Sequence, residues 1–200
     1  MHLEQIRPFS TDRLRLRGLT PQDQEALYAY RLLASVCLFV PFEPMTRAEI
    51  AERLVTRWAN QSLKHDGDGV LIGIEEIASG ALIGDISLQI TSLHDGNGEI
   101  GWVLNPAFGG KGLATEAAHS VLHLAFGEMG IRRVIARVDT RNTASIRLCE
   151  TLGMRQEAHL VENELFKGVY TDELNFAILD REFARTHEPN PINSCGSHSG

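Results

Sequence analysis

The chain has 200 residues, of which 43% are hydrophobic and 22% charged, and its formal net charge is −7 at pH 7. This length suits one domain with a core that needs no disulfide or metal, and the acidic balance disfavours nucleic acid as a partner. No apolar run approaches the roughly 18 residues of a membrane span, and the first residues lack the pattern of a secretory signal, so a membrane partner is not expected.

The spacing of the cysteines indicates the cellular compartment in which the protein acts. Cys37, Cys149 and Cys195 lie far apart in the sequence and form no C-x-x-C pair. Such spacing favours reduced thiols over a disulfide framework. We therefore expect a cytoplasmic protein.

The first quarter of the chain predicts one strand and two helices. Residues 11–19 alternate leucine with arginine, which is typical of a half-buried strand. Thr20 and Pro21 are a cap and a first-turn proline for a helix that should run to about residue 34. After an apolar loop at residues 36–44, Thr46 and Glu49 form a capping-box pair at the start of a second helix, expected to end near residue 61.

Two further runs predict an antiparallel hairpin. Residues 70–77 and 82–90 are rich in β-branched and apolar side chains, and Ser79-Gly80 lies between them. A second turn signal at residues 95–98 leads into another strand at residues 98–104.

A glycine-rich stretch, residues 105–117 (NPAFGGKGLATEA), follows that strand and opens a helix. Glycine allows a tight turn and a close approach of the backbone to a ligand. The first N–H groups of a helix have no partner within it and carry the positive end of its dipole. A phosphate or pyrophosphate would fit there, although a simple tight connection is the alternative.

Two nucleotide-binding motifs do not fit this stretch. A Walker A loop needs Ser or Thr after its Gly-Lys, but Lys111 is followed by Gly112. A Rossmann fingerprint needs a third glycine where this chain has Thr115.

The last third of the chain predicts a strand, a helix and a hairpin. Gly130 should end the long helix, residues 134–138 read as a strand, and residues 142–152 read as a helix closed by Gly153. Residues 156–166 and 170–179 should pair as a hairpin that turns at Lys167-Gly168. Residues 187–200 have no apolar periodicity and are expected to be a disordered tail.

The helix at residues 142–152 carries a second candidate motif. Asn142, Ser145, Cys149 and Leu152 lie at i, i+3, i+7 and i+10 and therefore share one helix face. If that face meets a ligand, Asn142 can bind an amide and Ser145 can approach a reacting atom. Alternatively, Asn142 caps the helix and Ser145 is a small packing residue.

The two motifs together resemble those of the GCN5-related N-acetyltransferase (GNAT) superfamily, and the resemblance runs from about residue 12 to 183. Its pyrophosphate loop, Q/R-x-x-G-x-G/A, is matched by Gly109-x-x-Gly112-x-Ala114, and its second motif, N-x-x-A/S-x-x-L, begins at Asn142. Gly109 departs from Gln or Arg, which removes a side-chain contact but leaves the backbone cradle.

The resemblance implies an α/β fold: a mixed, largely antiparallel twisted sheet of about seven strands with helices on both faces, splayed between the central strands. An acetyltransferase domain would cover residues 1–186. Acetyl-CoA would be the cosubstrate, and a backbone N–H of Val103 or Leu104 would stabilise the oxyanion. The residues implied to bind acetyl-CoA are Val103, Leu104, Gly109, Gly110, Lys111, Gly112, Leu113, Ala114, Thr115, Asn142 and Ser145.

The same resemblance implies catalytic residues. Many members use a tyrosine to protonate the departing thiolate, but this chain has Cys149 at that position. The chain is most similar to the branch that acetylates the N-termini of ribosomal proteins, in which the serine matching Ser145 is thought to serve instead. A carboxylate matching Glu164 is thought to be the base there. Glu162, two residues earlier on the same predicted strand face, is the alternative.

The implied reaction moves an acetyl group to a primary amine, either a protein N-terminal α-amine or a small-molecule amine, by direct transfer in a ternary complex. A homodimer is implied as well. The rival from another class is a non-catalytic acyl-CoA-binding or sensing module. No metal is expected, because His119 and His123 lie at i, i+4 without a third ligand. Trp58 and Trp102 are expected to pack as aromatics, and Cys149 to be a buried thiol rather than an acyl carrier.

Overall fold

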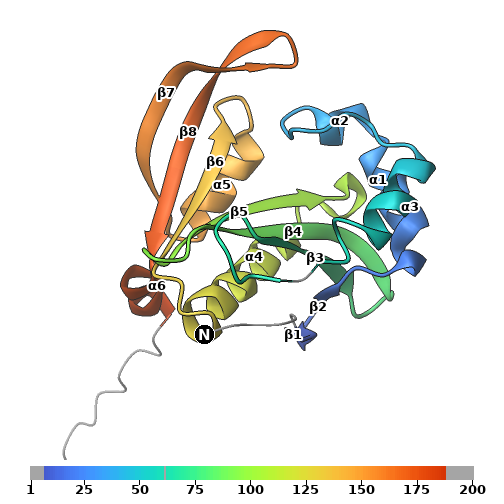
Figure 1. The fold of residues 1–200 in the computed structure, drawn as a ribbon, viewed down its shortest axis with the longest axis horizontal. Helices are drawn as coiled ribbons and strands as arrows, with labels where there is room; N and C mark the ends of the chain where they lie inside the picture. The colour runs from blue at the N-terminus through green and yellow to red at the C-terminus, as the bar shows by residue number, and fades with distance from the viewer. Residues whose placement is uncertain (1–6, 61, 188–200) are drawn as a thin grey trace, which may run out of the picture.

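One eight-stranded sheet runs through the described part of the chain, residues 7–60 and 62–187 of a computed structural model (Figure 1). Its strand order is β1-β2-β3-β4-β5-β6-β8-β7. The strands are β1 (Phe9–Ser10), β2 (Leu14–Gly18), β3 (Gly69–Glu76), β4 (Ala81–Ser92), β5 (Asn97–Leu104), β6 (Arg133–Asp139), β7 (Arg155–Phe166) and β8 (Val169–Leu179). The α/β fold with a largely antiparallel sheet is therefore confirmed, with one strand more than expected.

The sheet is splayed at its centre. All neighbouring strands are antiparallel except β5 and β6, which pair in parallel over three positions only, from Asn97 with Arg133 to Glu99 with Ile135. β5 then continues to Leu104 and β6 to Asp139 without pairing to each other. The two halves of the sheet thus diverge beyond Glu99, where the sequence implied a splay.

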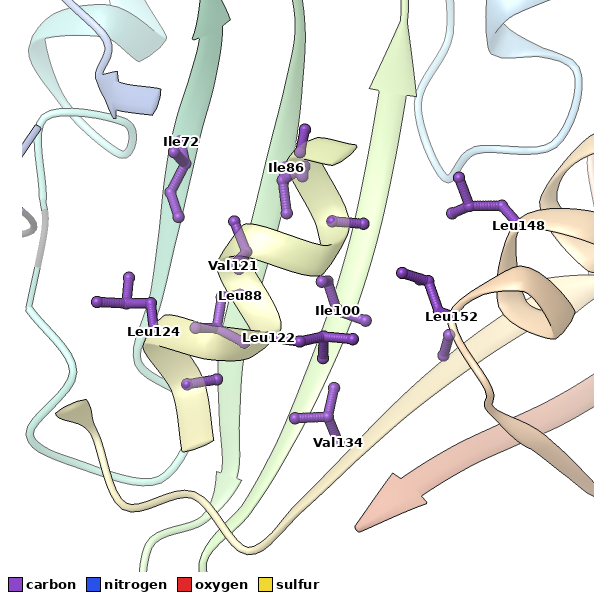
Figure 2. Close-up of a cluster of buried hydrophobic side chains, with 14 of the residues drawn as sticks. Ile72, Ile86, Leu88, Ile100, Val121, Leu122, Leu124, Val134, Leu148 and Leu152 are labelled. Atoms are coloured by element: carbon purple, nitrogen blue, oxygen red, sulfur yellow. The ribbon is translucent and has the colours of Figure 1, made fainter. Parts of the chain in front are cut away.

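Helices cover both faces of the sheet, as expected. The helical elements are η1 (Pro21–Asp23), α1 (Gln24–Arg31), α2 (Ala34–Cys37), α3 (Arg47–Val55), η2 (Pro106–Phe108), α4 (Leu113–His123) with its π-helical continuation η3 (Leu124–Glu128), α5 (Thr143–Thr151) and α6 (Asp180–His187). Figure 2 shows Val121 and Leu122 of α4 packed over Ile86, Leu88 and Ile100 of the central strands. A second core, with Leu27, Ile50 and Leu82, lies under α1 and α3 on the opposite face.

Helix boundaries depart from the sequence prediction on the N-terminal side. The first predicted helix divides into η1, α1 and α2, so part of the expected apolar loop is helical. The predicted capping pair of Thr46 and Glu49 forms, and at η1 the Asp23 carboxylate accepts from the Thr20 N–H at 2.8 Å. α3, however, ends at Val55 rather than near residue 61, because the chain turns there and buries Trp58 in the second core.

The chain ends were harder to predict. The two-residue strand β1 is too short to show a period, and α6 follows β8 directly. Residue 187 ends α6, whereas the remainder of the tail expected to be disordered lies outside the described residues. Within the described part, none of the helices is long and apolar enough to cross a bilayer.

A buried polar cluster ties α1 to the sheet. The Tyr30 hydroxyl donates to Asp85 Oδ2 at 2.5 Å, and Arg31 Nη2 donates to both Asp85 oxygens at 2.7 and 2.8 Å. The Arg31 guanidinium also lies 4.6 Å from the ring centroid of Phe42 and 4.9 Å from that of Trp58. Burial raises the pKa of Tyr30 well above its usual value, so the phenol remains a donor to the carboxylate.

We expect Arg31→Leu to lower the free energy of unfolding by about 3–5 kcal/mol, because it leaves the Asp85 carboxylate buried without its partner. The matched control is Arg15→Leu, which removes the half-exposed Arg15–Glu75 pair and should cost about 0–1 kcal/mol. Urea unfolding measures both values. Similar losses in the two variants would show that the buried pair adds nothing beyond a surface one.

Candidate active site

A cavity of about 580 Å³ passes through the splay between β5 and β6. Side chains from both faces of the sheet line it: Ile100 and Ala136 belong to the main core, whereas Glu99 and Arg137 belong to the face that α1 and α3 cover. Residues 39–45 and α3 supply the outer wall. The splay therefore brings residues from both faces of the sheet to one cavity.

The glycine-rich stretch links β5 to α4, as predicted. Gly110 and Gly112 have φ angles of +75° and +74°, a region in which a side chain is strained, so glycine is required at both positions. Gly112 is the N-cap of α4, and no side chain caps this helix. The first amides of α4 thus retain hydrogen-bonding capacity for an anion.

A second hollow, of about 190 Å³, lies between this loop and α5. Leu104, Gly110 and residues 112–115 line one side, and Ala144, Arg147, Leu148 and Thr151 line the other. Arg147 supplies a positive charge that the sequence analysis did not single out, because no feature separates it from a solvated helix residue. The two predicted motifs consequently meet at one hollow.

The segment between β1 and β2 holds the start of α4. Arg13 donates from Nη1 to the Lys111 carbonyl at 3.0 Å, and its Nε lies 2.6 Å from Glu116 Oε2. The Thr11 hydroxyl donates to the other oxygen of Glu116. Burial would raise the pKa of Glu116, but the hydrogen bonds from Thr11 and Arg13 and the Arg13 charge outweigh it and bring the pKa below its usual value.

Three polar residues on the inner wall of the larger cavity are joined. The Asn142 side-chain oxygen accepts from the Ser145 N–H at 3.1 Å and so caps α5, one of the two roles that the sequence left open. Trp102 Nε1 donates to Ser145 Oγ at 3.1 Å. Trp58 and Trp102 pack against the two cores as expected, and both also line the cavity together with Asn142 and Ser145.

The end of β5 presents a backbone amide to the splay. The Asn105 N–H donates to the Ile83 carbonyl at 2.8 Å, and Val103 pairs with Asp85 in the same antiparallel register. Because N–H directions alternate along a strand, the amides of Val103 and Asn105 point toward β4, whereas that of Leu104 points toward the gap. Of the two predicted oxyanion donors, Leu104 is the one oriented for the task.

The two candidate bases lie on the terminal hairpin. Glu162 has a φ of +48°, and its N–H donates to Asp172 Oδ1 at 2.9 Å, within a register shift between Leu160 and Glu164. This bulge breaks the strand alternation, so the expectation that Glu162 and Glu164 share a face no longer holds. Both side chains are exposed, and neither lines the larger cavity.

A group of electrostatically interacting charges includes Glu164 and reaches the cavity wall. It consists of Glu99 on β5, Arg137 on β6, Glu173 on β8 and Glu164 on β7, with Arg137 Nε 3.1 Å from Glu99 Oε1. Burial raises the pKa of Glu173, and the charge of Glu164 adds to that rise, while Arg137 opposes it. Glu99 lines the cavity but was not predicted from the sequence, because a single glutamate on a strand resembles a residue of a solvated face.

The tip of the terminal hairpin reaches across the cavity. Lys167, at the predicted turn, donates from Nζ to the carbonyls of Cys37 and Phe42 at 2.7 and 2.9 Å and lies 3.3 Å from Glu43. The hairpin formed by β7 and β8 therefore meets the end of α2 and the segment that follows it; the hairpin tip and α2 both lie in the upper part of Figure 1.

The structure also shows the surroundings of Cys149 and of the histidine pair His119 and His123. Cys149 is fully buried on α5, and burial raises the pKa of its thiol to about 12, which makes it a poor nucleophile. The rings of His119 and His123 pack against Phe183, with centroids 4.9 and 4.8 Å from it. Across the described residues, no group of three or more His, Cys, Asp or Glu side chains is placed to hold a metal ion.

The sequence and the fold of this chain are both similar to those of known acetyltransferases. The acetyltransferase (GNAT) domain family matches residues 13–155. The uncharacterized N-acetyltransferase YnaD of Bacillus subtilis is 31% identical over 174 residues, covering 87% of this chain and 98% of the relative. The crystal structure of a GNAT-family acetyltransferase from Bacillus anthracis is 28% identical, with a TM-score of 0.79, and covers 88% of this chain and 100% of that one.

Two more distant structures share the fold. One is a spermidine N-acetyltransferase from Vibrio cholerae in complex with CoA and spermine, at 23% identity, a TM-score of 0.74 and coverage of 86% of this chain and 99% of that one. The other is a ribosomal-protein-S5-alanine acetyltransferase from Vibrio fischeri, at 18% identity, a TM-score of 0.71 and coverage of 89% and 99%. The family match and the identity to YnaD over most of both chains show that this chain belongs to the GNAT family of N-acetyltransferases.

Proposed function

We propose that this protein transfers the acetyl group of acetyl-CoA directly to a primary amine while both substrates are bound, with residues 1–186 as the acetyltransferase domain. The observation that carries the proposal is the cavity through the splay, because it lets a thioester and an amine approach from opposite faces of the sheet. The buried, neutral Cys149 supports direct transfer over a covalent enzyme intermediate.

The pyrophosphate of acetyl-CoA would lie on the amides between Gly109 and Thr115, with Arg147 beside it. The pantetheine arm would then run along the hollow between α4 and α5 toward the splay. At its end, the Leu104 N–H would stabilise the oxyanion of the tetrahedral intermediate. Its neighbour Val103, which lines the cavity, would shape the site through its side chain rather than its amide.

Ser145 is the proposed partner of the departing thiolate. Trp102 donates its indole N–H to Ser145 Oγ, so an acceptor position of the hydroxyl is already taken. The hydroxyl proton can therefore point at the coenzyme sulfur. Cys149, at the usual tyrosine position, is fully buried, so its thiol does not compete for this role.

Glu164 is the proposed base, and it would act through water because its side chain does not line the cavity. Glu164 influences Arg137 and Glu173 electrostatically, and Arg137 pairs with Glu99 on the cavity wall. At pH 7, an α-amine with a pKa near 7.8 costs about 1 kcal/mol to neutralise, whereas a lysine costs about 4–5 kcal/mol. A base that acts only through water thus suits an α-amine better than a lysine side chain.

The acceptor is proposed to be a peptide N-terminus or a small amine, held between α3, residues 39–45 and the terminal hairpin. The named acceptors of the two distant structures, spermidine and a ribosomal protein, fall into these same two classes. The resemblance alone supports a homodimer. The free cysteines Cys37 and Cys149 support action in the cytoplasm.

The experiment that tests the function is release of free coenzyme A by purified protein given acetyl-CoA and a mixed panel of peptides and small amines. We expect thiol release that depends on at least one amine in the panel. Binding of acetyl-CoA without turnover on any amine would instead support the rival, a non-catalytic acyl-CoA-binding or sensing module.

Once an acceptor is known, we expect Glu164→Gln to lower kcat at pH 7 by about tenfold to a hundredfold and to leave the KM for acetyl-CoA nearly unchanged, the lower end of the range for general-base catalysis. The loss should shrink above the pKa of the amine, because the amine is then already neutral. Glu162→Gln is the control and should retain activity. Equal losses in both variants, or a loss independent of pH, would reject Glu164 as the base.

A further inference from the structure

The outer wall of the larger cavity carries two arginines, Arg53 and Arg57. Arg53 lies in the last turn of α3, and Arg57 lies just beyond its end. Among the described residues, neither side chain forms an ion pair within 4.0 Å. Arg53 is half-buried, and its guanidinium lies 5.8 Å from the ring centroid of Trp58, which packs beneath it.

Nearly all the other charges on this cavity have partners. Arg31 is paired with Asp85 at 2.7 Å and Arg137 with Glu99 at 3.1 Å. Two further acids are held by bases outside the cavity lining: Arg141 lies 2.6 Å from Asp139, and Lys167 lies 3.3 Å from Glu43.

Glu49 is the remaining acid on the cavity wall, and its carboxylate caps the start of α3. Its Oε2 accepts from the Thr46 N–H at 2.7 Å and from the Thr46 hydroxyl at 2.8 Å. These hydrogen bonds are the main cause that lowers the pKa of Glu49, and the charge of Arg53 is a smaller one. Arg53 and Arg57 outnumber Glu49, so the α3 wall has an excess of positive charge, although the net charge of the whole chain is −7.

We propose that the acceptor amine carries a carboxylate, and that Arg53 and Arg57 bind it. Guanidinium groups suit this task because their planar N–H groups match a carboxylate with two hydrogen bonds. A polyamine, by contrast, would bring further positive charge toward these arginines.

The inference rests on the proposed function, since it specifies the acceptor of the same transfer. The carboxylate has two sources with shared chemistry: a free amino acid, or a peptide with an acidic side chain next to its N-terminal residue. Both place the anion within a few bonds of the amine, and the test separates them.

The test measures binding of acetylated products, which removes differences in amine pKa from the comparison. With coenzyme A present, isothermal titration compares N-acetyl amino acids with their amides, and N-acetyl peptides having Glu at the second position with those having Gln. We expect one carboxylate series to bind at least about tenfold more tightly than its neutral counterpart, and the advantage to weaken with salt.

Variants then assign the effect to the arginines. Arg53→Gln and Arg57→Gln should each reduce the carboxylate preference to about threefold or less, in the range expected for loss of a charge-assisted hydrogen bond. Arg181→Gln, an exposed position on α6 outside the cavity, is the matched control and should keep the full preference. Equal urea stability of the variants excludes a loss of fold.

The outcomes distinguish this inference from the proposed function. A carboxylate preference that the Arg53 and Arg57 variants abolish supports the inference even when no thiol is released. Thiol release that is fastest with a polyamine, or equal binding of acid and amide, overturns the inference while leaving the acetyl transfer in place. A preference that survives in both variants also overturns it.

Discussion

The structure depends on the point at which β5 and β6 stop pairing. Their parallel ladder ends at Glu99 and Ile135, and beyond it the backbone groups facing the gap lack strand partners. Buried backbone groups need hydrogen-bond partners, so a gap of this kind is stable when something else enters it. Here Ser145 of α5 lines the cavity beside Trp102, and the Leu104 amide faces the gap, so the thioester of the proposed reaction would meet polar groups there.

Two sets of contacts, one from each half of the splayed sheet, position the segment that follows α1. On the N-terminal half, the buried Asp85 fixes α1, and with it the segment that follows. On the C-terminal half, the hairpin sends Lys167 across the cavity to the carbonyls of that same segment. The wall of the proposed acceptor pocket is therefore built from parts of both halves.

Local signals made much of this fold predictable. The capping pair of Thr46 and Glu49 marked the start of α3, and the glycine-rich stretch at Gly112 marked the turn from β5 into α4. The end of α3 was not predictable, because burial of Trp58 in tertiary contacts decides it. Arg31 and Asp85 are 54 residues apart, and no local pattern connects them. The bulge at Glu162 likewise interrupts a segment that the sequence predicts as one regular strand.

The most direct test of the account is the affinity for coenzyme A of Gly112→Ala compared with Gly80→Ala. Both glycines have positive φ, +74° and +68°, so each substitution carries a similar backbone strain, but Gly80 lies in the turn between β3 and β4, away from the loop. If the amides of the loop grip the diphosphate, Gly112→Ala should weaken coenzyme A binding by about tenfold or more, and Gly80→Ala should leave it within about twofold. Equal affinities in the two variants would contradict the account.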